Sequence, residues 1–376
     1  MMLLGIILHS SNTYMVFDAG EAWVIKDPNS THPINGLLTG TIHSFRMQIF
    51  FLIAGFFGSM LFYERRPIVM IKNRISRIVL PFIVFVILLW PSIVFTFSYT
   101  ELLFDGNKNA MGITLSYFNS PFILIPESTF HLWFLFYLSL ITIVTVILGS
   151  IFKKLPRLSN YISIVFEWIM GKTYLRVFIF SFLTAILYLI IGSYESPISN
   201  SFTPDLDTFI YFLFFYLIGW VLFKSKHLLS TFLKADRVFA FLGLLIFTPI
   251  FLIISPSLDF EINIIITSLI LWINIFGIMG LFIRYTSNHS NLMRYISDAS
   301  YWVYLIHLPL TVIIPGLIVD WPIHAIIKML FVSTCTSIIC FFSYHYLVRN
   351  TFIGQFLNGR KYSGFRSISK NQIQPT

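Results

Sequence analysis

Apolar residues fill long stretches of this chain, and short polar connections separate them. Most stretches have the roughly 17–25 residues that a helix needs to cross the hydrocarbon core of a bilayer. The pattern therefore predicts an all-α, polytopic transmembrane bundle of about ten spans in residues 1–349, followed by a basic cytoplasmic tail at 350–376. The expected spans are residues 1–17, 41–63, 76–99, 130–152, 174–192, 207–224, 237–255, 262–284, 295–318 and 323–347.

The composition supports a membrane protein. Hydrophobic residues make up 57% of the 376 residues and charged residues 11%, and the mean hydropathy is +0.81. Because an ordinary soluble domain carries about 25% charged residues, the soluble globular class is excluded. The N-terminus has neither a charged n-region nor a small-residue cleavage site, so we expect no cleavable signal peptide.

The distribution of charge predicts the topology. Most of the 25 basic residues lie in the tail and in alternate connections around residues 65–77, 153–176, 224–237 and 284–294. By the positive-inside rule, these connections and both termini should be cytoplasmic. Such an asymmetry, without an organelle-targeting signature, favours a bacterial inner membrane. The net charge of +9 is then explained by contact with the lipid bilayer, and we expect no nucleic-acid partner.

Four histidines and one arginine lie in the outer halves of four predicted spans. His43 and Arg46, three residues apart at the start of the second span, should share one helix face. His9 lies in the first span, His131 begins the fourth, and His307 lies past the midpoint of the ninth. An arginine within a membrane span costs roughly 2.5–3.5 kcal/mol on insertion scales, so it should face protein or a wet cavity. The simpler alternative is that all five groups are interfacial and structural.

The same residue types suggest acid–base chemistry. Histidine, with an unperturbed pKa near 6.5, can act as a general base at neutral pH. We expect His9, His43, Arg46 and His307 to surround one cavity in the outer half of the membrane. No metal is expected, because no two of the histidines have i,i+4 spacing and no carboxylate lies near them in sequence. A proton-coupled transporter would usually have an embedded Asp or Glu, whereas nearly all acidic residues here fall in connections.

Two further patterns concern packing and access. The long connection from Glu101 to Thr129 carries apolar residues such as Phe118 and Phe122, so we expect it to lie outside and help cover the cavity. The alternative is a surface amphipathic segment. Gly55 and Ser59, four residues apart, should let another helix pack closely against the second span.

Five segments together carry a resemblance to a known family. They are His9; His43-Ser44-Phe45-Arg46-Met47-Gln48 continuing to Phe57; Arg74-Ile75-Ser76-Arg77 continuing to Pro81; His131-Leu132-Trp133-Phe134-Leu135; and Ser300-Tyr301 continuing to His307-Leu308-Pro309. This pattern resembles the acyltransferase-3 family of membrane O-acyltransferases. The likeness is specific at residues 2–81, 131–135 and 300–309, and it is hydropathic elsewhere.

The resemblance implies transfer of an acyl group, succinyl or acetyl, from cytoplasmic acyl-CoA to a hydroxyl of an extracytoplasmic glycan. Acyl-CoA would be the donor substrate, and no resident cofactor is expected. His9 or His43 would be the general base. Arg46 or a neutral histidine would stabilise the oxyanion that develops on the thioester.

Other residues of the pattern are expected to bind substrate. His131, Trp133, Tyr304 and His307 form one expected set. A second set stands at the cytoplasmic start of the third span, where arginine could hold the phosphates of CoA bidentately. Its members are Lys72, Arg74 and Arg77. The alternative for this second set is ordinary positive-inside anchoring.

The chain departs from the family pattern at one position. An Arg or Lys is expected eleven positions before the first-span histidine, and that position falls ahead of Met1. A first span of only 17 residues favours a start further upstream. The alternative function, from another class, is a transporter or flippase of an acyl or glycan species, or an inactive relative.

Overall fold

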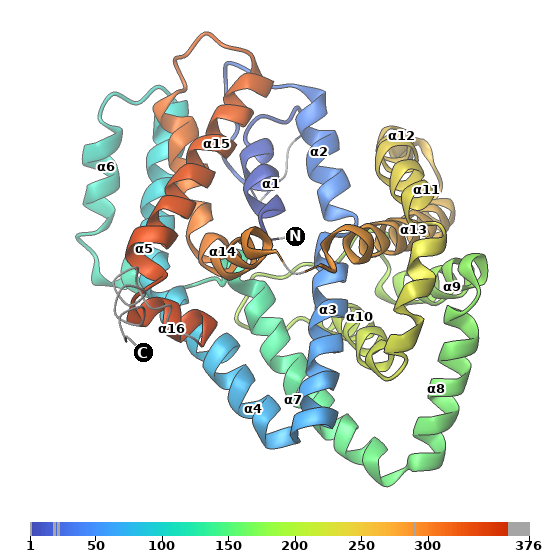
Figure 1. Cartoon of the computed structure of the whole chain (residues 1–376). Coiled ribbons are helices and arrows are strands. Elements are labelled where there is room, and N and C mark those ends of the chain that lie inside the picture. Colours follow the sequence, from blue (N-terminus) through green and yellow to red (C-terminus); the bar gives the residue numbers. More distant parts are fainter. Residues whose placement is uncertain (1, 18–19, 21–22, 289, 360–376) are drawn as a thin grey trace, which may run out of the picture. The chain divides into compact units, whose positions relative to one another are not determined.

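The computed structural model describes residues 2–17, 20, 23–288 and 290–359, and every regular element in these ranges is a helix (Figure 1). The expected all-α class is therefore confirmed. Most of the predicted basic tail lies outside the described residues.

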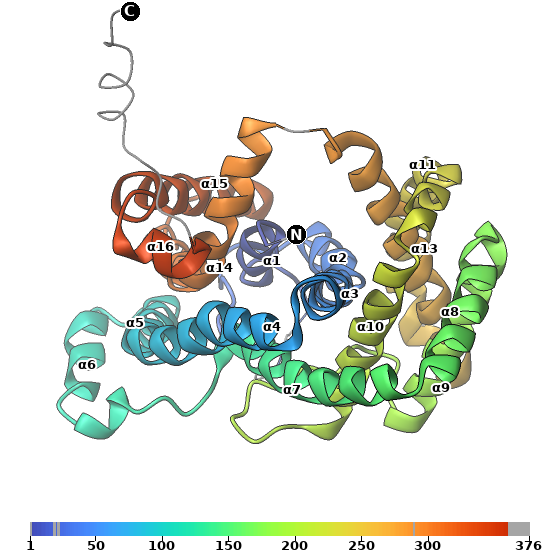
Figure 2. The same ribbon diagram turned by 60° about the horizontal axis from the view of Figure 1, so that its bottom comes forward.

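The chain divides into two compact units, and each is described by itself. The first contains Gly36–Arg74 and Glu127–Ser290. Within it, α8 joins the end of α7 to the start of α9 (Figure 2). Its elements are α2 (Pro33–His43) from Gly36 onward, α3 (Arg46–Met60), η2 (Leu61–Arg65), α4 (Pro67–Arg74), η5 (Phe130–Leu132), α7 (Trp133–Lys154), α8 (Pro156–Met170), α9 (Thr173–Ile191), α10 (Leu206–Lys224), η6 (Lys226–Lys234), α11 (Asp236–Phe241), η7 (Leu242–Phe247), α12 (Thr248–Ile254), η8 (Ser255–Ser257) and α13 (Phe260–Thr286).

The second unit contains Met2–Asn35, Ile75–Pro126 and the described part of Asn291–Thr376. Its elements are α1 (Leu4–Asn12), η3 (Ile75–Val79), α5 (Leu80–Phe104), α6 (Ala110–Tyr117), η4 (Pro121–Leu124), α14 (Asn291–Leu317), α15 (Ala325–Ser343), η9 (Tyr344–Val348) and α16 (Phe352–Asn358). Ile6 of α1 packs against Val303 of α14 and Cys340 of α15, so α1 is part of this unit's apolar core.

Nine helical segments in the described residues are long and apolar enough to cross a membrane, which supports a multi-pass membrane protein. They correspond to the expected spans from 41–63 onward. The expected span 1–17 is not among them, because α1 has nine residues. At 1.5 Å per residue it is about 14 Å long, roughly half the thickness of the hydrocarbon core.

The short α1 has a local cause in the polar run from Ser10 to Thr13. Ser and Asn side chains bond to nearby backbone groups and so compete with the helix; Ser11 Oγ donates to the Ile7 carbonyl at 2.8 Å. Beyond the helix, the Thr13 carbonyl accepts from the Asp27 backbone N–H at 2.9 Å. The chain therefore leaves its helical path at Asn12 and bonds to residues further along.

Two glycines allow α3 and α10 of the first unit to touch. A Cβ atom added at Gly55 would lie 1.9 Å from the Tyr216 carbonyl oxygen, and one added at Gly219 would lie 1.8 Å from the Leu52 carbonyl oxygen. Small residues of this kind let membrane helices approach backbone to backbone. The expected close packing at Gly55 is confirmed.

The connection after α5 folds onto α5 itself. Trp90 Nε1 of α5 donates to the Ile123 carbonyl at 2.7 Å, and the rings of Phe95 and Phe118 lie 6.3 Å apart. Phe122 is 75% exposed. Some apolar residues of this connection thus pack on α5, and others are exposed at the surface. That the connection covers the expected cavity stays a prediction.

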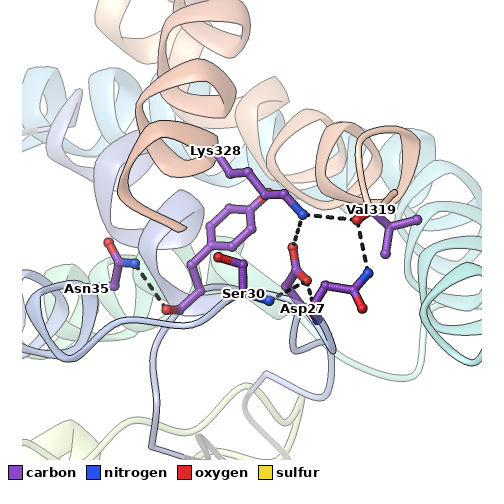
Figure 3. A network of polar contacts seen from close by, with 7 residues as sticks. Asp27, Ser30, Asn35, Val319 and Lys328 are labelled. Carbon is purple, nitrogen blue, oxygen red and sulfur yellow. Dashed lines mark hydrogen bonds and ion pairs between the residues drawn. The ribbon is translucent and has the colours of Figure 1, made fainter. Parts of the chain in front are cut away.

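A buried ion pair holds the residues after α1 to α15 (Figure 3). Lys328 Nζ lies 2.8 Å from Asp27 Oδ2, and both side chains are fully buried. Lys328 also donates to the Val319 carbonyl at 3.0 Å. Asp27 Oδ1 accepts from the backbone N–H groups of Asn29 and Ser30 at 2.8 and 3.1 Å. The carboxylate and the ammonium are therefore both solvated by protein groups.

Further bonds extend this network to the start of α2. Asn35 Nδ2 and the backbone N–H of His32 both donate to the Tyr14 carbonyl, at 3.0 and 2.9 Å. Asn29 Nδ2 donates to the Val319 carbonyl at 3.1 Å. Residues on either side of Asp27 are thus fixed by the same polar cluster.

Gly219→Ala should destabilise the protein by about 1–3 kcal/mol or more, because the new methyl group meets the α3 backbone and the packed helices must separate. Thermal unfolding of the purified protein in detergent measures the loss. Gly171→Ala is the matched control, since its Cβ would lie 3.3 Å from the Glu167 carbonyl, within reach of a small adjustment. Equal stability of the two variants would contradict the close contact.

Asp27→Asn should lower the melting temperature strongly, because it leaves the Lys328 ammonium buried without its counter-charge, a loss of about 3–5 kcal/mol. Adding Lys328→Met should restore much of the stability, since the double variant no longer buries a charge. Asp320→Asn, at an exposed acid of the same unit, is the control. A double variant as unstable as the sum of the two single variants would refute the coupling.

Candidate functional site

His9 lies in an aromatic cluster of the second unit. Its ring stacks on Trp23, with centroids 5.3 Å apart and an interplanar angle of 21°. The His307 ring of α14 lies at the same centroid distance from His9, tilted by 42°. Trp23 also meets Phe97 of α5 edge to face at 5.5 Å. Two of the sequence-predicted histidines are therefore in direct contact.

Backbone carbonyls orient the second histidine of this cluster. His307 Nδ1 lies 2.7 Å from the Tyr304 carbonyl and 3.1 Å from the Val303 carbonyl. Because a carbonyl only accepts, Nδ1 carries the proton, and in the neutral ring Nε2 is then the basic nitrogen. The Tyr304 ring lies 6.3 Å from the His307 ring. The helix backbone thus selects one tautomer of His307.

Trp23 is a member of this cluster that sequence reasoning missed. Its Nε1 donates to Thr13 Oγ1 at 3.1 Å, and it is 5% exposed. The Thr13 carbonyl accepts from the N–H of Asp27, which is the acid paired with Lys328. The only sequence feature that could have drawn attention to Trp23 is that a tryptophan occurs in a polar connection. That feature does not indicate that Trp23 contacts His9.

The other predicted catalytic pair belongs to the first unit. His43 is the last residue of α2, and Arg46 is the first residue of α3. They therefore flank a break between two helices instead of sharing one continuous helix. The backbone leaves helical geometry at Phe45, whose φ is −142°. The preceding Ser44 Oγ donates back to the Thr41 carbonyl at 2.8 Å and accepts a bond from Asn274 Nδ2 at 3.3 Å.

A buried polar network begins two residues after Arg46. Gln48 Nε2 donates to Ser196 Oγ at 2.6 Å and to the Tyr211 hydroxyl at 3.0 Å. The Tyr211 hydroxyl lies 2.8 Å from that of Tyr188. The start of α3 is therefore fixed to α9, to α10 and to the connection between them. Gln48 was part of the family-like pattern, but its partners were not predictable.

His131 and Trp133 of the first unit are both buried, at 8% exposure each. His131 lies in the short helix η5, directly after Phe130, whose φ of 43° is positive. The Trp133 ring contacts Phe212 at 5.2 Å and Phe51 at 6.4 Å. Packing in the aromatic core explains the position of Trp133, and its contact with substrate stays a prediction.

The three predicted phosphate-binding cations have different surroundings. Lys72 is exposed on α4. Arg74 Nη2 donates to the Ala54 carbonyl of α3 at 3.0 Å, which ties α4 to α3 within the first unit. Arg77 belongs to the second unit, where its carbonyl accepts from the Tyr301 hydroxyl at 2.8 Å. The Arg74 side chain thus also has a structural role, whereas the bond at Arg77 involves only its backbone.

The structure places the predicted residues in two local groups. His9, His307 and Tyr304 are close together in the second unit, and His43 and Arg46 flank one helix break in the first. The expectation of one common cavity stays a prediction. In the described residues, no group of three or more His, Cys, Asp or Glu side chains is placed to hold a metal ion.

Comparison with known proteins identifies the family. A family model described as an acyltransferase domain matches residues 1–344. Glucans biosynthesis protein C of Shigella dysenteriae serotype 1 (strain Sd197) is 28% identical over 322 residues, which cover 83% of this chain and 79% of the relative. The protein of the same name from Escherichia coli O1:K1 / APEC gives the same values, and that of Salmonella paratyphi B (strain ATCC BAA-1250 / SPB7) is 26% identical over 328 residues, with the same coverage of both chains.

No solved structure matches this chain. Because the matched family domain spans most of its length, the protein is an acyltransferase that transfers groups other than aminoacyl groups, and it belongs to the acyltransferase-3 family.

Proposed function

We propose that this protein is a multi-pass O-acyltransferase of a bacterial inner membrane, with both termini in the cytoplasm. It would move a succinyl or acetyl group from cytoplasmic acyl-CoA to a hydroxyl of an extracytoplasmic glycan. The single observation that carries the chemistry is the contact of His9 with Trp23 and His307. Relatives named for glucan biosynthesis support a glycan as the acceptor.

In the proposed reaction, His9 is the general base. Its imidazole takes the proton of the acceptor hydroxyl as the oxygen attacks the thioester carbonyl. Collapse of the tetrahedral intermediate breaks the C–S bond, and CoA leaves as a thiolate that takes the proton from the imidazolium. The products are an O-acyl ester and free CoA. His307, held in one tautomer by the Tyr304 carbonyl, would position His9 or accept a bond from the sugar.

His43 and Arg46 keep their proposed catalytic roles. Arg46 would stabilise the negative charge that develops on the thioester oxygen, since a guanidinium donates two parallel hydrogen bonds. Its place at the first turn of α3, two residues before the fixed Gln48, supports a well-defined orientation. Lys72, Arg74 and Arg77 are proposed to attract the phosphates of CoA, and Arg74 would do so in addition to its bond to the Ala54 carbonyl.

His9→Ala should reduce acyl transfer by roughly 10²–10⁴-fold, because general-base catalysis contributes that factor. Transfer of a labelled succinyl or acetyl group from CoA to periplasmic glucan, by protein reconstituted in liposomes, measures the effect. His324→Ala, at an exposed histidine of the same unit, should leave transfer unchanged. Full activity of His9→Ala with no activity of His43→Ala would make His43 the base. Glycan that crosses the membrane without being acylated would instead support a transporter.

Arg46→Lys should also reduce the rate of transfer, since lysine keeps the positive charge but loses the planar pair of donors. The Michaelis constant for acyl-CoA should change less than the turnover number if Arg46 acts on the transition state. Steady-state kinetics at matched membrane expression separate these parameters. Wild-type turnover in Arg46→Lys would remove Arg46 from the oxyanion site.

A further inference from the structure

An open pocket in the first unit has the chemistry of a lipid site. It has a volume of about 720 Å³ and lies where α7 and α10 end and α8 begins. We name it the basic pocket. Its lining residues are Tyr63, Phe152, Lys153, Pro156, Arg157, Ser159, Asn160, Ser163, Glu167 and Lys224.

The basic pocket has an excess of positive charge. Three lining residues are basic, namely Lys153, Arg157 and Lys224, and one, Glu167, is acidic. Glu167 already accepts a bond from Ser225 Oγ at 3.1 Å. None of the ion pairs formed within the described residues includes any of the three cations. The pocket therefore attracts an anion.

Two of the three cations are held in place by neutral groups. Lys224 Nζ donates to Ser159 Oγ at 2.5 Å and lies over the Tyr63 ring at 4.7 Å. Lys153 Nζ lies over the Phe62 ring at 4.5 Å. Ring faces and a hydroxyl position these ammonium groups but leave their positive charge uncompensated.

The first turn of α8 adds to the positive electrostatic potential of the basic pocket. Pro156, Arg157, Ser159 and Asn160 line the pocket, and α8 begins at Pro156 without a side-chain cap. The amino end of a helix carries a partial positive charge and N–H groups that bind phosphate. Three cations and a helix terminus thus point to a phosphate-sized anion.

An apolar slot continues from the basic pocket between α7, α8 and α10. The two share Tyr63, Phe152, Ser159, Ser163 and Lys224. The slot has a volume of about 70 Å³, and its further lining residues include Leu148, Gly149, Ile162, Leu217, Trp220 and Val221. A ligand that fills both parts needs an anionic head and an apolar chain.

The flanking helix places this opening near lipid headgroups. Helix α8 is not one of the nine candidate spans in the described residues, yet Tyr161, Ile164 and Trp168 expose large apolar side chains. Lys172 lies over the Trp168 ring at 3.8 Å. Amphipathic helices with aromatic and basic residues lie in the membrane interface. A lipid can therefore enter sideways, along α8.

We propose that the basic pocket binds an anionic phospholipid of the surrounding bilayer. Its phosphate lies between Lys153, Arg157 and Lys224 at the amino end of α8, and one acyl chain enters the slot beside Ile162. The phosphates of acyl-CoA share this chemistry. The bilayer lipid is the occupant that the exposed apolar face of α8 favours.

Binding of phosphatidylglycerol to the full-length protein in phosphatidylcholine nanodiscs tests the proposal. Native mass spectrometry should show saturable binding to the wild type. The triple variant Lys153→Gln/Arg157→Gln/Lys224→Gln should bind roughly 100-fold more weakly, since each basic residue contributes about tenfold or less. The control Lys154→Gln/Lys234→Gln/Arg237→Gln removes the same charge from exposed positions outside the pocket and should bind as the wild type does.

A second variant tests the slot without changing charge. Ile162→Trp should weaken phosphatidylglycerol binding while its melting temperature in lipid-free detergent stays near that of the wild type. Equal binding by both triple variants would overturn the site, as would equal binding of phosphatidylcholine and phosphatidylglycerol. Displacement of phosphatidylglycerol by micromolar succinyl-CoA would assign the basic pocket to the acyl donor and overturn the proposal that it binds a bilayer lipid.

Discussion

The buried pair of Asp27 and Lys328 is the constraint on which the candidate site of the second unit depends. A buried ion pair is stable only when the other hydrogen-bonding sites of both charged groups also have partners. Here two backbone N–H groups bond to the Asp27 carboxylate, and the Val319 carbonyl accepts from Lys328. The pair fixes the chain on one side of Asp27, where Trp23 stacks on His9. The catalytic geometry we propose is therefore held by an electrostatic contact, since the short α1 offers limited apolar surface.

Hydropathy was sufficient to predict most of the fold. Long apolar runs specify helices in a membrane because no other open structure satisfies its backbone there, and nine expected spans have counterparts in the described residues. The exception is residues 1–17, where length and hydropathy suggested a span. The polar run from Ser10 to Thr13 redirects the chain, and a hydropathy average does not register four small polar residues within an apolar segment.

The local partners of the site could not be predicted in the same way. Lys328 lies inside an expected span and is 301 positions from Asp27, and nothing in either local sequence indicates the other. The same holds for Gln48 and Tyr211, which are 163 positions apart. The histidines were singled out because an ionisable group in a span is rare and costly, and their roles stay predictions. Their neighbours are ordinary residues whose importance comes only from tertiary contact.

The two contacting histidines should therefore have different tasks. The Nδ1 proton of His307 is committed to backbone carbonyls of its own helix, so the ring is oriented before any substrate arrives. His9 is held by ring contacts with Trp23 and His307, which restrict the plane of its ring. A base must gain and lose a proton in each turnover, whereas a positioning group must not. The oriented ring of His307 therefore fits the role of the positioning residue in the reaction we propose, in which His9 is the base.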